Sequence, residues 1–126
     1  MQTTDDLNEE HAEMVHALVK PGDVILAELT GKSADLWHGA TGVVGEAGEL
    51  IDAVKKYCVY NKPLDRENVV EEMGDIEFYL EQIRQNLGIT REETLRANMA
   101  KLAKRYASGK FTNEAAQARA DKALGE

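Results

Sequence analysis

The sequence predicts an all-α protein in which antiparallel helical hairpins form a four-helix-bundle-like domain, completed by oligomerisation. The composition is ordinary, with 43% hydrophobic and 30% charged residues, and it favours helix because Ala, Leu, Glu and Lys are well represented and only two residues are proline. Apolar residues recur in steps of three and four along three long segments, whereas no segment alternates apolar and polar residues as a strand would. A chain this short is not expected to bury three apolar stripes alone, so we expect it to oligomerise.

Length and charge limit the classes of protein to consider. The 126 residues contain no Pro-, Gly- or Ser-rich linker, so we expect a single domain over 1–126 whose tail after about residue 112 is peripheral. The net charge of −8 argues against a nucleic-acid partner. The lone Cys58 cannot form an internal disulfide; we expect it to be buried, in a cytoplasmic protein. No window approaches the roughly 18 apolar residues of a membrane span, and the amino terminus resembles no export signal.

Two helices are predicted in the first half of the chain. The first runs from about residue 6 to 29 and is interrupted or bent at Pro21-Gly22. The second begins with Ser33 as N-cap and continues to about Val59, because Asn61-Lys62-Pro63 must end it. Its apolar stripe consists of Ala40, Val43, Ala47, Leu50, Val54 and Tyr57.

Two further helices are predicted in the second half. Asp65 can cap a helix that continues to Asn86 and stops at Gly88. Thr90 and Glu93 form a capping-box signature for the last one, which reaches the Ser108-Gly109 stop. The stripe of the third helix is Val69, Met73, Ile76, Leu80, Ile83 and Leu87, and that of the fourth is Leu95, Met99, Leu102 and Tyr106.

Four acids lie beside the stripes of the second and third helices. Glu46 and Glu49 share one helix face, and Glu72 and Asp75 share another, because residues three apart on a helix are neighbours. In an antiparallel hairpin that turns at Pro63, Glu49 and Asp75 are predicted to lie level. Four converging carboxylates need protons or a cation. Ligands that are all carboxylates favour Mg²⁺, with Mn²⁺ also possible.

Glycines surround the first acidic pair at intervals of three residues. Each costs about 1 kcal/mol relative to alanine inside a helix, so a row of them needs a reason. One reason is close approach by another backbone or a bulky ligand; the alternative is that the helix is not continuous before Gly45. Gly74 stands beside Asp75 in the same way. The row consists of Gly39, Gly42, Gly45 and Gly48.

Candidate substrate-binding residues flank the acids. Asn98, Lys101 and Arg105 share one face of the fourth helix and could hold phosphates, although a solvated face with cations near a helix C-terminus is the alternative. An aromatic group can stack on a base and a histidine can hydrogen-bond its edge, or these side chains can simply pack in the core. The candidates are Trp37, His38 and Tyr79, with Phe78 open to the same two interpretations.

The ordered motifs resemble a known family, the all-α MazG and dimeric dUTPase pyrophosphohydrolases. The family's E-x-x-E and E-x-x-D motifs stand here as Glu46-Ala47-Gly48-Glu49 and Glu72-Met73-Gly74-Asp75, and residues 98–106 are similar to its N-x-x-K-L-x-x-R-Y segment. The resemblance implies Mg²⁺-dependent hydrolysis of (deoxy)nucleoside triphosphates to the monophosphate and pyrophosphate, in a homodimer or homotetramer.

Roles follow from the same resemblance. The four acids would bind the metal, Glu46 or Glu49 would orient or deprotonate the attacking water, and Lys101 and Arg105 would stabilise the leaving pyrophosphate. Cleansing of the nucleotide pool is the implied role. The alternatives are a phosphoribosyl-ATP pyrophosphohydrolase-like enzyme and a non-catalytic helical oligomerisation or regulatory module. A di-iron carboxylate protein is disfavoured, because it needs Glu-x-x-His pairs at such a site and neither Glu49 nor Asp75 is replaced by His.

Overall fold

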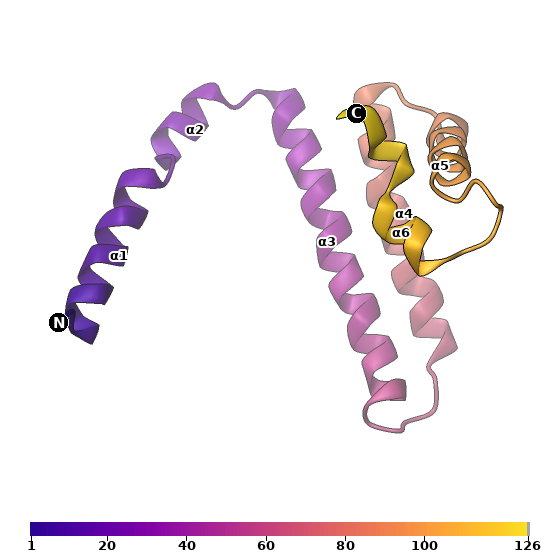
Figure 1. Cartoon of the computed structure of the whole chain (residues 1–126), viewed down its shortest axis with the longest axis horizontal. Helices are drawn as coiled ribbons and strands as arrows, with labels where there is room; N and C mark the ends of the chain where they lie inside the picture. Colours follow the sequence, from indigo (N-terminus) through magenta and orange to yellow (C-terminus); the bar gives the residue numbers. More distant parts are fainter. Residues whose placement is uncertain (126) are drawn as a thin grey trace. The chain divides into compact units, whose positions relative to one another are not determined.

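A computed structural model describes residues 1–125, with side chains described for residues 1–122. The elements in that range are all helical, and none of them is a strand, so the predicted all-α class is confirmed (Figure 1). None of the described helices is both long enough and apolar enough to cross a membrane. In chain order the elements are α1 (Thr4–Leu18), α2 (Gly22–Glu28), α3 (Gly31–Cys58), α4 (Arg66–Leu87), α5 (Arg91–Arg105), α6 (Asn113–Ala118) and the short 3₁₀ helix η1 (Ala120–Gly125).

The chain divides into two compact units, the first of which is Met1–Ala34. Helix α1 begins with a capping box: the backbone N–H of Asp6 donates to the Thr3 hydroxyl at 3.1 Å, and the Thr3 N–H donates to the Asp6 carboxylate at 3.0 Å. The predicted interruption at Pro21-Gly22 is confirmed. Pro21 is the N-cap of α2, so the predicted helix is two separate helices.

The start of α3 differs from the prediction. The Ser33 N–H donates to the Thr30 hydroxyl at 3.1 Å and the Thr30 N–H donates to the Ser33 hydroxyl at 2.9 Å. Thr30 is therefore the N-cap, and Ser33 takes the place that Glu or Gln has in a capping box. The helix continues without a break to Cys58, so the alternative of an interruption before Gly45 is wrong.

The second unit, from Asp35 onward, contains an antiparallel hairpin of α3 and α4 (Figure 1). Two glycines of α3 explain how closely the helices approach. A Cβ on Gly39 would lie 2.8 Å from Ile83 Cγ1, and one on Gly42 would lie 2.3 Å from the Tyr79 ring. The Gln82 amide also donates to the Asp35 carbonyl at 3.2 Å. These contacts fix which turn of α3 faces which turn of α4.

The predicted ends of α4 and the start of α5 are confirmed. The Asn68 N–H donates to the Asp65 carboxylate at 3.0 Å, and the Glu93 N–H donates to the Thr90 hydroxyl at 3.0 Å. Gly88 closes α4 with a φ of 66°, a left-handed conformation that glycine adopts without strain. Helix α5 ends at Arg105, before the predicted Ser108-Gly109 stop. The tail, expected to be peripheral, packs on α5 through α6 and η1.

Little of the chain's apolar surface is covered. The buried residues of the described structure are Gly39, Ala53 and Asp121, and the first two lie on α3. Small residues such as Gly39 and Gly42 thus form the closest part of the contact between α3 and α4, and the residues of the apolar stripes are half-buried or exposed. The prediction that Cys58 is buried is wrong, because its side chain is exposed at the end of α3.

Candidate metal centre

Helices α3 and α4 bring three carboxylates together. Glu46, Glu72 and Asp75 each offer an oxygen, and these atoms all lie within 4.8 Å of one another. The contacts between α3 and α4 explain why these carboxylates meet. Gly42 of α3 lies against Tyr79 of α4, so one turn nearer the hairpin loop Glu46 reaches Asp75. Glu72, three residues before Asp75 on the same face of α4, completes the group.

Glu49 lies outside this group and is exposed, so the predicted level pairing of Glu49 with Asp75 is wrong by about one turn. The cause is the path of the hairpin loop. The Lys62 N–H donates to the Lys56 carbonyl at 3.1 Å, so the loop returns beside the last turns of α3. Pro63 and Asp65 line a hollow with Ala53 and Lys56, and α4 therefore starts alongside Ala53 rather than alongside the end of α3.

Glu72 is the most perturbed acid of the group. It is half-buried, and its Oε2 is enclosed with no hydrogen-bond partner among the described residues. Burial raises the pKa of Glu72, and side-chain hydrogen bonding with Glu46 raises it further. The negative charges of Glu46, Asp75 and Glu49 act in the same direction. The group therefore favours a bound proton or a bound cation.

The donor set fits a hard divalent cation. An enclosed carboxylate oxygen without a partner is unfavourable, and a cation would satisfy it while cancelling the repulsion among the acids. Three carboxylate ligands leave positions in the six-fold coordination of Mg²⁺ for water or phosphate oxygens. Asp75 is exposed, so the centre is open to solvent on its side.

Two of the three predicted base-binding residues, His38 and Tyr79, lie in contact with each other. The rings of His38 on α3 and Tyr79 on α4 meet edge to face, with centroids 5.9 Å apart. Tyr79 is half-buried against Gly42, one turn from Asp75. Trp37 is 64% exposed and Phe78 is 67% exposed, so neither packs in a core within this chain.

The predicted phosphate-binding residues lie on α5. Asn98 and Lys101 are exposed, whereas the Arg105 guanidinium forms a bidentate ion pair with Asp121 of η1, Nε to Oδ1 at 2.6 Å and Nη2 to Oδ2 at 3.1 Å. Within the described part of the chain, no hydrogen bond or ion pair joins these three residues to the acidic group. Asp121 was not predicted from the sequence, because no local spacing links it to Arg105.

Comparison with known proteins supports a family assignment. The family model of the MazG nucleotide pyrophosphohydrolase domain matches residues 39–109, which is more than half of the chain. No curated protein and no solved structure matches this chain. The matched region contains the four acids and the three α5 residues but excludes Trp37, His38 and Asp121. The chain belongs to the MazG nucleotide pyrophosphohydrolase domain family.

Proposed function

We propose that this protein hydrolyses (deoxy)nucleoside triphosphates to the monophosphate and pyrophosphate in a Mg²⁺-dependent reaction, as part of nucleotide-pool cleansing. The observation that supports it most strongly is the group of Glu46, Glu72 and Asp75, which lies inside the region matched by the family model. An acidic face with no ligand would spread its carboxylates into solvent, whereas this one holds a carboxylate oxygen enclosed and without a partner.

The acids divide into two roles. Glu46, Glu72 and Asp75 would hold the cation, which when bound would neutralise charge on the phosphate oxygens. Glu49 is exposed beside them and stands outside the group. Its carboxylate can orient a water molecule or accept its proton, and we assign it that role in preference to Glu46.

The remaining residues would position the substrate. Asn98 and Lys101 offer donors to phosphate from the exposed surface of α5, and Arg105 offers a planar guanidinium. The His38–Tyr79 pair, with Trp37 next to His38, offers an edge and ring faces to a base. These assignments rest on the chemistry of the side chains.

The proposal is tested by pyrophosphate release from canonical, deoxy and oxidised triphosphates and from phosphoribosyl-ATP, with Mg²⁺. We expect turnover of nucleoside triphosphates by the parent and a loss of at least about a hundredfold in Glu49→Gln and Asp75→Asn. Glu81→Gln removes one exposed charge from α4 and should retain parental activity. Turnover of phosphoribosyl-ATP alone would reassign the substrate class. Undiminished activity in both acid variants would contradict the assignment of the site. Absence of turnover with every substrate would favour a non-catalytic module.

A further inference from the structure

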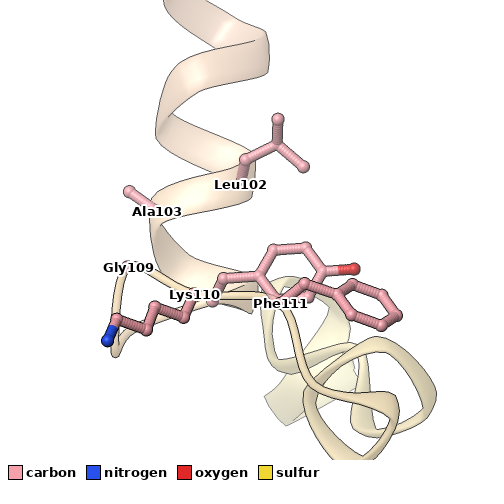
Figure 2. Close-up of a pocket in the computed structure, with 6 residues that line it drawn as sticks. Leu102, Ala103, Gly109, Lys110 and Phe111 are labelled. Atoms are coloured by element: carbon pink, nitrogen blue, oxygen red, sulfur yellow. The ribbon is translucent and has the colours of Figure 1, made fainter.

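The chain reverses direction after α5 and returns along it. Figure 2 shows Leu102 and Ala103 on the last turns of α5, with Gly109, Lys110 and Phe111 on the loop beside them around a hollow of about 310 Å³. The ring centroids of Phe111 and Tyr106 lie 5.8 Å apart. Thr112 caps α6 by accepting from the Ala115 N–H at 3.0 Å. This path carries the C-terminal segment, residues 112–125, back to Arg105.

Asp121 is held there more firmly than a surface carboxylate would be. Its side chain is 4% exposed and that of Arg105 is 17% exposed, and both carboxylate oxygens accept from the guanidinium. The hydrogen bonds from Arg105 lower the pKa of Asp121 against the opposing effect of burial, and the charge of Lys101 lowers it further. Asp121 is thus an anion that interacts with both cations assigned to the phosphates.

Carboxylate and phosphate compete for the same guanidinium geometry. Two parallel N–H donors of an arginine bind two oxygens of either group, so Nε and Nη2 cannot serve Asp121 and a phosphate together. The segment that carries Asp121 is short: α6 spans six residues and η1 spans six. Helices of this length are marginal by themselves, so the segment can detach without unfolding the hairpin.

We propose that Asp121 is a built-in competitor of the substrate: it occupies the anion-binding position on Arg105, and a polyphosphate must displace it and release the C-terminal segment. This inference rests on the proposed function, because it takes Lys101 and Arg105 as the phosphate-binding cations. The apparent affinity for a polyphosphate is then reduced by the fraction of molecules in which the segment is bound. The segment acts as an autoinhibitory contact that favours ligands with several phosphates.

The first test measures binding of inorganic tripolyphosphate to the full chain by calorimetry, with EDTA present so that no divalent cation contributes. We expect Asp121→Asn to bind about tenfold more tightly than the parent. Glu114→Gln removes the same charge from an exposed position of the same segment and should change affinity less than about twofold. Unchanged or weaker binding by Asp121→Asn would overturn the proposal, as would an absence of binding to both the parent and this variant.

The second test needs no substitution and so does not depend on the variant folding. Hydrogen exchange of the unmodified chain should become faster at the amides of α6 when tripolyphosphate is added. Exchange that stays constant or slows while tripolyphosphate binds would contradict displacement. Both readouts are independent of turnover. A parent that hydrolyses no triphosphate would contradict the proposed function but not this inference. An active parent whose binding of tripolyphosphate is unchanged by Asp121→Asn would contradict this inference but not the proposed function.

Discussion

Glu72 shows at the scale of one residue why the acidic group is unfavourable without a ligand. Burial raises its pKa, its neighbours Glu46 and Asp75 raise it further, and its enclosed Oε2 has no partner in the described structure. A raised pKa means that the folded state holds the proton more tightly than the unfolded state does. The ionised carboxylate therefore weakens the metal-free fold once the pH exceeds the usual pKa of a glutamate.

The Glu72→Gln variant should accordingly be more stable than the parent when metal is absent. In EDTA at pH 7 we expect its melting temperature to exceed that of the parent. The difference should shrink as the pH falls to about 4, because the parent's Glu72 is then protonated as well. Scanning calorimetry across this pH range checks the prediction. A parent that is the more stable protein at pH 7 would contradict it.

At the scale of the helix pair, two glycines of α3 are required and others are not. A Cβ at Gly42 would overlap the Tyr79 ring, whereas a Cβ at Gly45 would meet no described atom within 4 Å. Alanine at position 45 should therefore gain helix propensity, and alanine at position 42 should force the hairpin apart.

These two substitutions form a matched pair. In metal-free protein, we expect Gly45→Ala to stabilise the fold by up to about 1 kcal/mol and Gly42→Ala to destabilise it by about 1–3 kcal/mol. Urea unfolding monitored by circular dichroism measures both. Equal effects of the two substitutions would show that the Gly42–Tyr79 contact does not hold the hairpin.

The helix pair also shows what local sequence patterns can predict. The caps at Asp65 and Thr90 and the glycine end at Gly88 were predictable, because each depends on residues within one turn. The N-cap of α3 was misplaced from Thr30 to Ser33, because either hydroxyl can begin a helix. The hairpin register was wrong by about one turn, because it depends on how the loop folds back against Lys56.

The candidate site, like the helix pair, could be predicted from the sequence only in part. Facing acidic pairs were predicted from their spacing, and the structure groups three of the four, leaving Glu49 outside. The partner of Arg105 was not predictable, because Asp121 reaches it only through the reversal after α5. Long-range pairs of this kind depend on the tertiary path of the chain.

At the scale of the whole molecule, the exposed apolar side chains need an explanation. The stripe residues Met73, Val54 and Tyr57 are all exposed, and Ala53 is the one buried apolar side chain of the described structure. Apolar surface on this scale indicates an interface with another protein chain. Since α3 and α4 carry these residues beside the acidic group, we propose that a second copy of the chain covers them, in a homodimer or homotetramer.

Sedimentation equilibrium tests this proposal. We expect a mass of two or four times the 13.9 kDa of the chain. Replacing the exposed Ile51 of α3 with Asp should shift the equilibrium toward the monomer, because it would place a charge within the apolar interface. Replacing the exposed Asp52 with Asn serves as the control on the adjoining face. A parent that sediments as a stable monomer would contradict the assembly.

The central claim is that Glu46, Glu72 and Asp75 together bind a divalent cation between α3 and α4. Titration of the metal-free protein with Mn²⁺, followed by the loss of free-ion signal in electron paramagnetic resonance, tests it most directly. The parent and Glu81→Gln should bind Mn²⁺ with similar affinity, and Glu72→Gln should bind at least about tenfold more weakly. Binding of Mn²⁺ by Glu72→Gln with the affinity of the parent would contradict the account.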